Sequence, residues 1–356
     1  MGYMNMSNGK VYEKELMRID TEIVELILKR IEVLKQFDYN RLKYVLTSRR
    51  KDTVESLAEK YGISRDMLLH IFSYIDGIAI ESIKPLTVGF LGPRGSFTEE
   101  ATLKMFNDQG ALLTAYPSIY DIFRAVENRE VEYGVVPLEN SLEGSVGETL
   151  DMLAQSSVKI CGETEVRISH NFIVKPGTRL EDIKIVLSHP MALAQCRNFI
   201  YTKLKNVKIE TRSSTAEAVK ECVERENVAA IGSELAARIY GGEILVRGIE
   251  DHKENYTRFI AIGNKPLDKG VDVKTSVIFT LRDVPGALYK ALEPFAIRGI
   301  NLTKIESRPI KNRPWEYMFF MDFNGSIEDS KIRDALEEFI ARTTSVKILG
   351  SYKKIP

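Results

Sequence analysis

The chain has 356 residues and a formal net charge of zero, from 50 basic and 50 acidic side chains. This length predicts two or three domains, and the balanced charge offers no footprint for nucleic acid or an anionic membrane surface. The three cysteines and four histidines lie far apart, which argues against a disulfide framework or a zinc site and favours a cytoplasmic location. Neither a signal peptide nor a membrane-spanning stretch of roughly 18 apolar residues is visible.

Residues 11–83 have a helical pattern throughout. Apolar residues recur every three or four positions from Leu16 to Leu34, which predicts a helix of roughly 25 residues. Two shorter helices are expected at 52–61 and 64–83. Pro85 ends this region, so we assign residues 1–84 to an all-α N-terminal domain.

From residue 86 to 263 short apolar strands alternate with helical patterns. This alternation predicts an α/β domain with mostly parallel strands. Its loops at strand C-termini lie where such folds bind ligands. The expected strands are 87–91, 133–136, 171–174, 183–187, 228–231 and 258–262.

A polar segment at 264–274 predicts a linker. The remaining residues, 275–356, follow the order β-α-β-β-α-β, which predicts a ferredoxin-like α+β unit. Its elements are expected at 276–281, 287–297, 302–307, 316–323, 328–341 and 345–352.

Polar loops precede several of the α/β helices. In the run 134–149, a strand ends at Pro137 and polar residues follow until Ser145 and Glu148 form a capping box. Similar helix starts are expected at 96–99, 188–190 and 214–217. Helix N-termini rich in hydroxyls hold carboxylates or phosphates without a metal. Because no phosphate-binding glycine motif is present, a carboxylate is the favoured ligand.

The pentapeptide 255–259 (Asn-Tyr-Thr-Arg-Phe) begins the last strand of this domain. Arg258 can bind a carboxylate through two hydrogen bonds, and Thr257 can hydrogen-bond a departing oxygen. The alternative is that the pentapeptide is an ordinary strand start whose side chains alternate between faces.

Four motifs, at 92–101, 134–149, 188–196 and 255–259, resemble those of prephenate dehydratase, in the same order. Residues 286–288 and 301–309 resemble the phenylalanine-binding motifs of the ACT regulatory domain attached to that enzyme. The resemblance implies a catalytic domain at 86–263 with two lobes, as in periplasmic binding proteins, and an ACT domain at 275–356. The chain is expected to cross between the lobes near residues 140–145 and again before Thr257.

The resemblance also implies a function. The expected enzyme is a carbon–oxygen lyase of aromatic amino acid biosynthesis (the shikimate pathway) that converts prephenate to phenylpyruvate without a cofactor or metal. Phenylalanine is the expected effector, and the protein is expected to form a homodimer or homotetramer. Thr257 is the expected catalytic residue. The expected substrate-binding residues are Ser96, Thr98, Asn140, Ser141, Ser145, Ser188, Ser214, Thr215, Arg258 and Phe259, and the expected effector-binding residues are Gly286, Ala287, Leu288, Asn301, Leu302, Glu306, Ser307 and Arg308.

The N-terminal helices resemble the chorismate mutase domain carried by some of these enzymes. Arg30 falls on a substrate arginine of that family, and Arg41 is a second candidate, but other active-site positions depart from its pattern. Two readings therefore stay open: a dehydratase alone, and a bifunctional enzyme that also acts on chorismate. The cadence of residues 54–72 is also that of a DNA-binding helix-turn-helix, and a ligand-binding module without turnover is a further alternative. The neutral charge argues against the first of these, and the presence of Thr257 and Arg258 against the second.

Overall fold

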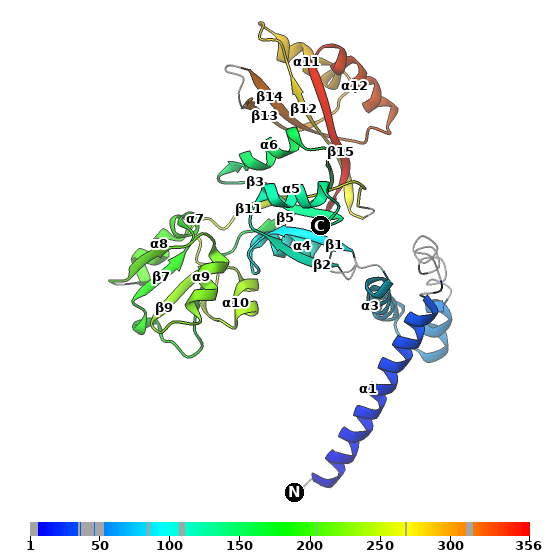
Figure 1. Cartoon of the computed structure of the whole chain (residues 1–356), viewed down its shortest axis with the longest axis vertical. Coiled ribbons are helices and arrows are strands. Elements are labelled where there is room, and N and C mark those ends of the chain that lie inside the picture. The colour runs from blue at the N-terminus through cyan, green and yellow to red at the C-terminus, as the bar shows by residue number, and fades with distance from the viewer. Residues whose placement is uncertain are drawn as a thin grey trace. The chain divides into compact units, whose positions relative to one another are not determined.

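A computed structural model describes residues 6–34, 36, 46, 53–83, 86–106, 111–204, 206–267, 269–310 and 316–356. The chain divides into two compact units (Figure 1). One unit comprises residues 1–86 with 106–112, and the other contains the rest of the chain. Among the described residues, no helix is long and apolar enough to cross a membrane.

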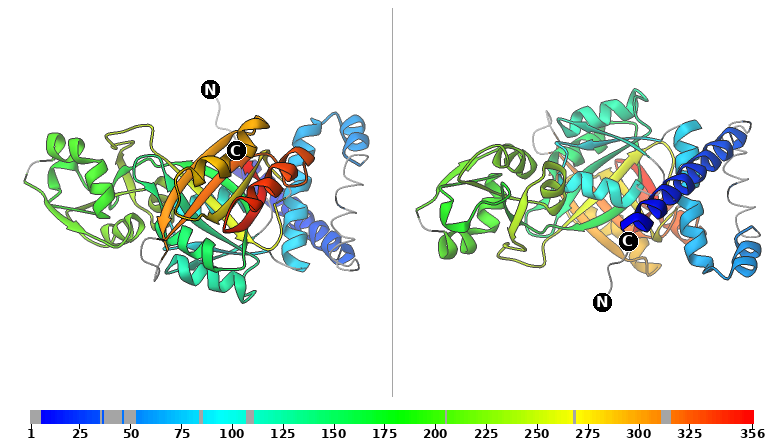
Figure 2. Two further views of the ribbon diagram at one scale, coloured as in Figure 1. Left: turned by 90° about the horizontal axis from the view of Figure 1, so that it is seen from above. Right: turned by 90° about the horizontal axis from the view of Figure 1, so that it is seen from below.

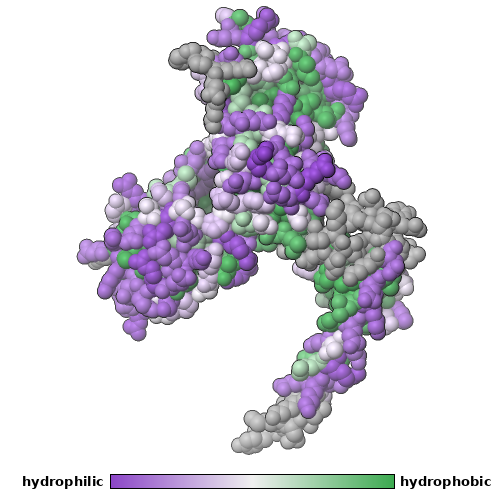
Figure 3. All heavy atoms as spheres, in the orientation of Figure 1, coloured by the Kyte–Doolittle hydropathy of each residue, from purple (hydrophilic) through white to green (hydrophobic). Residues whose placement is uncertain are grey.

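The first unit is helical, as the sequence predicts. It contains α1 (Met6–Leu34), helical residues 53–61 and α3 (Arg65–Ile83). Its small core includes Ile31, Leu34 and Ala79. The N-terminal part of the apolar stripe of α1 is exposed instead, with Leu16 at 59% and Leu26 at 64% of their full exposure. Figure 3 shows apolar residues at the surface of this unit.

Within the part of the chain that the structure describes, the second unit contains two sheets. The larger has ten strands in the order β13-β14-β12-β15-β5-β11-β3-β1-β2, with β4 paired to β3. The helices α4 (Phe97–Phe106), α5 (Ile119–Glu127), α6 (Gly147–Gln155), α11 (Ala287–Ile297) and α12 (Ser330–Ala341) accompany it. Its strands are β1 (Thr87–Leu91), β2 (Leu112–Tyr116), β3 (Tyr133–Asn140), β4 (Gly144–Ser145), β5 (Lys159–Arg167), β11 (Tyr256–Gly263), β12 (Val271–Thr280), β13 (Leu302–Pro309), β14 (Tyr317–Asn324) and β15 (Ser345–Ile355).

The smaller sheet has five strands in the order β10-β6-β9-β7-β8. Figure 2 shows it with its helices as a body of its own beside the larger sheet. Two α/β lobes are therefore present, as predicted. The strands are β6 (Asn171–Val174), β7 (Ile185–Ser188), β8 (Lys208–Thr211), β9 (Val228–Gly232) and β10 (Glu243–Val246), and the helices are α7 (Pro190–Gln195), α8 (Arg197–Lys203), α9 (Thr215–Cys222) and α10 (Glu234–Tyr240).

The first crossing between the lobes differs from the prediction. Residues 140–145 do not leave the first lobe, because Asn140 pairs with Gly144 and the chain turns back along β3 as β4. The chain continues through α6 and β5 of the larger sheet and crosses only at residues 168–170. The return runs through residues 247–255, between β10 and β11. The polar run after Pro137 is thus a reverse turn, whose sequence signature a crossing shares.

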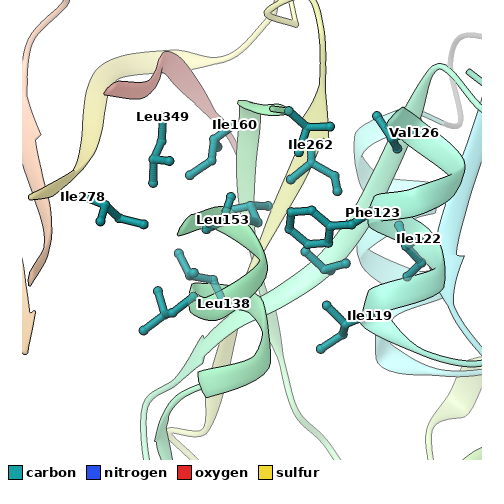
Figure 4. Packing of buried hydrophobic residues seen from close by; sticks show 14 of the residues in the cluster. Ile119, Ile122, Phe123, Val126, Leu138, Leu153, Ile160, Ile262, Ile278 and Leu349 are labelled. Carbon is teal, nitrogen blue, oxygen red and sulfur yellow. The ribbon is translucent and has the colours of Figure 1, made fainter. Parts of the chain in front are cut away.

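The ferredoxin-like unit is joined to the first lobe as one continuous sheet. Strand β15 pairs in parallel with β5 at Lys354–Glu163 and Ile355–Thr164. A single apolar core spans the junction, since Ile278 and Leu349 pack into the same cluster as Leu138, Leu153 and Phe123 (Figure 4). The predicted linker is shorter than expected, because β12 already begins at Val271.

Candidate active site

The centre of the candidate site is a hydrogen bond between strands β3 and β11. These strands are antiparallel, and their register places Thr257 opposite Asn140. The Asn140 Nδ2 atom donates to Thr257 Oγ1 at 2.9 Å. Thr257 is only 8% exposed, so its hydroxyl is held in a defined position at the end of the strand.

The turn after Asn140 is built by Asn140 itself. Its Oδ1 atom accepts hydrogen bonds from the backbone N–H groups of Leu142 (2.9 Å) and Glu143 (3.0 Å). This arrangement is typical of asparagine in turns. Ser141 Oγ accepts the backbone N–H of Tyr256 at 3.0 Å, which ties the turn to the start of β11. The side-chain amide of Asn140 is therefore fixed at both ends.

A chain of polar side chains continues from Asn140 into the second lobe. Asn140 Nδ2 also donates to Asn255 Oδ1 at 2.7 Å, and Asn255 Nδ2 donates to Gln195 Oε1 at 3.2 Å. Gln195 ends α7 of the second lobe, and its Oε1 lies 3.1 Å from His170 Nε2. The chain thus reaches from Thr257 to the segment at which the backbone first crosses between the lobes.

Asn255, Gln195 and His170 are not among the residues predicted for the site. Asn255 and Gln195 stand inside recognised motifs, which was the available signal, whereas His170 carried none. Burial lowers the pKa of His170 against the opposing effects of its Gln195 hydrogen bond and Glu250. A neutral His170 donates from Nε2 to Gln195, and its Nδ1 atom has no hydrogen-bond partner among the described residues.

Arg258 lies on the opposite face of β11 from Thr257, as alternation along a strand requires. Its Nε donates to Glu163 at 2.6 Å, its Nη1 to Asp322 at 2.5 Å and its Nη2 to Tyr352 at 2.9 Å. Although burial alone would lower the Arg258 pKa, Tyr352, Asp322 and Glu163 raise it above the ordinary value. The guanidinium of Arg258 is therefore not available beside Thr257 for the expected contact with a substrate carboxylate.

Two more predicted substrate contacts lie elsewhere. Ser145 Oγ bonds Glu306 and accepts from Lys304 Nζ at 2.7 Å, so it faces the ACT part of the chain. The predicted capping box at Ser145 is wrong, because Val146 is the N-cap of α6 and no side chain caps it. Phe259 is 2% exposed and belongs to the core.

The remaining predicted residues stand at helix starts or strand ends. Ser96 and Ser214 cap their helices, accepting the backbone N–H of Glu99 (3.2 Å) and of Glu217 (3.0 Å), as predicted. Thr98 is buried and Thr215 begins α9. Ser188 is not an N-cap: it ends β7 and donates to the Ile231 carbonyl at 2.7 Å, whereas His189 caps α7.

A cavity of about 420 Å³ opens beside the segments that connect the lobes. Phe97, Arg167, Asn171 and Lys253 are among its lining residues, and Thr257 is not. The Phe97 and His170 rings form a T-shaped pair, with 5.7 Å between ring centroids. Phe97, which lines the cavity, thus contacts His170 at the end of the polar chain that leads to Thr257. Among the described residues no cluster of three metal-ligating side chains occurs.

The predicted effector residues divide between two places. Gly286 has a left-handed backbone (φ +77°) before α11, where Ala287 and Leu288 form the first turn. Leu302 begins β13, on which exposure alternates, and Asn301 directly precedes this strand. Glu306 and Arg308 point toward the first lobe: Arg308 binds both carboxylate oxygens of Asp151, at 2.5 and 2.9 Å. Ser307, between them, is exposed.

The predicted mutase residues are only partly described. Arg30 forms an ion pair with Asp76, which is 2% exposed, and its guanidinium lies 5.9 Å from the centroid of the Phe72 ring. Arg41 lies outside the described residues. Asp76 therefore already neutralises the one predicted mutase arginine whose surroundings are described.

Comparisons with known proteins show the family to which the chain belongs. Residues 88–267 match the prephenate dehydratase family, and residues 275–341 match the ACT domain. The chain belongs to the prephenate dehydratase family. It is 39% identical to a bifunctional chorismate mutase/prephenate dehydratase of Aquifex aeolicus, over 98% of this chain and 99% of that protein. It is also 44% identical to a prephenate dehydratase of Methanocaldococcus jannaschii, over 73% of this chain and 95% of the relative.

A solved structure has the same architecture. It is a prephenate dehydratase from Arthrobacter aurescens in complex with L-Phe, 35% identical, with a TM-score of 0.68 over 75% of this chain and 90% of the other. The present protein is thus a prephenate dehydratase with a C-terminal ACT domain and a helical region before both.

Proposed function

We propose that the chain converts prephenate to phenylpyruvate at the end of β11, with Thr257 beside the departing hydroxyl group. The single observation that carries this assignment is the 2.9 Å hydrogen bond from Asn140 to Thr257. Because Asn140 donates to the Thr257 oxygen, the threonine proton is free to point at another acceptor. A hydroxyl group so oriented can hydrogen-bond the oxygen that leaves the substrate ring.

The reaction needs little more than correct placement. The bond between the ring and its carboxylate breaks, and its electron pair enters the ring while the hydroxyl group leaves with a proton as water. Carbon dioxide and phenylpyruvate are the other products, and aromatisation drives the step. Threonine is a weak acid, so Thr257 stabilises developing charge on the departing oxygen, and solvent supplies the proton. Assistance of this kind contributes about 10²–10⁴-fold to a rate.

Substrate carboxylates are assigned to helix starts of the two lobes. Ser96 and Ser214 cap α4 and α9, whose first turns carry Thr98 and Thr215, and both helices present backbone N–H groups with a favourable dipole. Because the Ser96 and Ser214 hydroxyls already cap their helices, backbone N–H groups are the proposed donors there. Arg258 contributes through the protein rather than by touching substrate.

We assign phenylalanine to the ACT domain as effector. The assignment rests on the resemblance of 286–288 and 301–309 to phenylalanine-binding motifs and on the relative solved with L-Phe. Gly286 supports it, since its left-handed backbone opens into free space beside the first turn of α11. An effector acts only through different affinities for two states of the protein, so phenylalanine must prefer a state with a less active site.

The similarity to the Aquifex aeolicus relative extends over the N-terminal helices, which favours a second activity on chorismate. The Arg30–Asp76 ion pair speaks against it, because a dianionic substrate needs cations that are not already neutralised. We keep the dehydratase as the proposed activity and the bifunctional enzyme as the second candidate.

A homo-oligomer is proposed from α1. Leu16, Ile23 and Leu26 lie on one stripe of this helix, and each has at least half of its surface exposed. Such an apolar stripe is suited to packing against a second copy of the same helix. The three cysteines are unpaired and buried, which fits the reducing cytoplasm as the proposed compartment.

One assay separates these candidates. The purified full chain is given chorismate and then prephenate, with and without phenylalanine, and phenylpyruvate is followed. Turnover of prephenate alone supports a dehydratase with a helical scaffold, and turnover of both supports the bifunctional enzyme. No phenylpyruvate from prephenate would refute the proposal.

A further inference from the structure

Two neighbouring residue pairs on β3 and β11 serve opposite faces of the sheet. The register places Thr257 opposite Asn140 and Arg258 opposite Glu139. Because side chains alternate along a strand, Thr257 and Asn140 share one face, and Arg258 and Glu139 share the other. The first pair forms the candidate active site. The second pair is held by the ACT domain.

Arg258 is held by a buried anion of the ACT sheet. Asp322, on β14, is 0% exposed and binds Arg258 Nη1 at 2.5 Å. Its second oxygen accepts from Ser276 on β12, and Ser276 Oγ lies 2.5 Å from the Tyr352 hydroxyl on β15. Side chains from three strands of the ACT domain therefore hold the guanidinium of Arg258 in place, directly or through Asp322.

Glu139 is likewise bound by a residue of the ACT domain, Lys304 of β13. Lys304 Nζ donates to Glu139 Oε1 at 2.8 Å and to Ser145 Oγ at 2.7 Å. The residue after Glu139 is Asn140, the hydrogen-bond partner of Thr257. Figure 1 shows β13 and β14 of the ACT domain next to α6 and β3. Both members of the catalytic pair thus have a covalent neighbour tied to the ACT domain.

The same face of β13 carries proposed effector residues. Lys304, Glu306 and Arg308 alternate with exposed residues, and all three contact the first lobe: Glu306 at Ser145, and Arg308 at Asp151. Burial alone would raise the pKa of Glu306, but the hydrogen bonds from Ser145 and Lys304 lower this pKa below its usual value. A ligand that binds Glu306 or Arg308 competes for groups that dock this strand onto the turn bearing Asn140.

We propose that Asp322 and Lys304 are the positioning residues through which the ACT domain acts on Asn140 and Thr257, by way of Arg258 and Glu139. The inference rests on the proposed function and adds a route to it. Phenylalanine shifts β13 and β14 relative to the first lobe, and the two ionic contacts carry that shift to the two strands. Breaking either contact weakens the effect of phenylalanine on the reaction without removing the phenylalanine site.

The test uses the full chain with Lys304→Met and, separately, Asp322→Asn. Lys331→Met serves as the control, because Lys331 is an exposed lysine of the same domain on α12. Turnover of prephenate is measured over a range of substrate and phenylalanine concentrations, so that changes in kcat and KM are separated. Phenylalanine binding to each protein is measured by calorimetry.

We expect Lys304→Met to bind phenylalanine with the stoichiometry of the unmodified chain. The phenylalanine concentration needed for half-maximal inhibition of turnover should nevertheless rise at least tenfold. Asp322→Asn is expected to lose inhibition too, with a changed kcat and a KM near that of the unmodified chain. Should Asp322→Asn fail to fold, Lys304→Met still decides, since its side chain lies at the domain boundary. Unchanged inhibition in Lys304→Met, with phenylalanine bound, would overturn the inference while leaving the proposed function intact. If the unmodified chain neither turned over prephenate nor bound phenylalanine, the proposed function would fail first and this inference with it.

Discussion

Thr257 and Arg258 are consecutive residues of β11 that face opposite sides of the sheet. The Thr257 hydroxyl accepts a 2.9 Å hydrogen bond from Asn140, and the Arg258 guanidinium binds Asp322 at 2.5 Å. The candidate chemistry and the attachment of the ACT domain are therefore one residue apart.

Thr257→Ala is expected to lower kcat by about 10²–10⁴-fold, because the substitution removes the hydroxyl group beside the departing oxygen. KM should change less, since the carboxylates are held by other groups. Thr257→Ser is the matched control and should retain most of the activity. Steady-state kinetics, with circular dichroism to verify the fold, give the result. A Thr257→Ala protein with near-normal phenylpyruvate production would rule out the role.

Asn140→Asp separates the two functions of the Asn140 side chain. The new carboxylate can still accept the Leu142 and Glu143 backbone N–H groups, so the turn should persist. It cannot donate to Thr257, whose proton would instead be drawn toward the carboxylate. We expect a loss of kcat of about 10²-fold, comparable to the removal of one well-placed donor. Asn140→Ala should also loosen the turn, seen as a lower melting temperature; equal kcat in Asn140→Asp and the unmodified chain would contradict the assignment.

Local sequence patterns predicted the helical N-terminal unit, the ferredoxin-like order of the ACT part and the positions of Thr257 and Asn140, but they missed the strands β2, β5, β8 and β10. Both residues stand at strand boundaries inside polar motifs, which was the available signal. The strands around them are not mostly parallel as predicted: β3 and β11 are antiparallel, and this pairing brings the end of β3 beside the start of β11. The partners of Ser145 and Arg258 were not foreseeable in this way. Their hydroxyl and guanidinium look like substrate ligands in sequence, but they bind Glu306 and Asp322, more than 60 positions away in the chain.

The polar chain through Asn255, Gln195 and His170 was missed for a related reason. Its members come from three separate segments, and only the packing of the two lobes brings them within hydrogen-bond distance. The first crossing was misplaced because a turn and an inter-lobe connection have the same polar composition. Hydrogen bonding between β3 and β4 distinguishes them, and that pairing depends on tertiary structure.

His170 should make the protein sensitive to acid. Burial lowers its pKa below the ordinary 6.5, so in the folded state it stays neutral at pH values where the unfolded chain already binds a proton. Stability is therefore fully present above about pH 6.5 and declines as the pH falls toward the lowered folded pKa. We expect the melting temperature of His170→Asn to depend less on pH, between about pH 5 and pH 7, than that of the unmodified chain. If the melting temperatures of the two proteins changed equally with pH across that interval, the expectation would be refuted.

Gly350→Ala should weaken the junction between the ACT domain and the first lobe. Gly350 has φ +148°, and a Cβ atom there would lie 2.4 Å from the Ile160 carbonyl oxygen. Because that oxygen belongs to the backbone of β5, the strand pairing itself must shift. We expect a loss of about 2–5 kcal/mol in the free energy of unfolding, from the left-handed backbone and the overlap together.

Gly299→Ala is the control for the backbone contribution to the Gly350→Ala effect. Its φ is +60°, but the added Cβ would meet nothing within 4 Å, so it should lose only about 1–2 kcal/mol. Thermal unfolding followed by calorimetry compares the two variants. Because Gly350 lies where β15 packs on β5 and Gly299 lies in the loop after α11, only Gly350→Ala should also expose the shared core and increase the binding of a hydrophobic dye. Equal losses in the two variants would show that the overlap with the Ile160 carbonyl adds no cost, which would contradict this expectation.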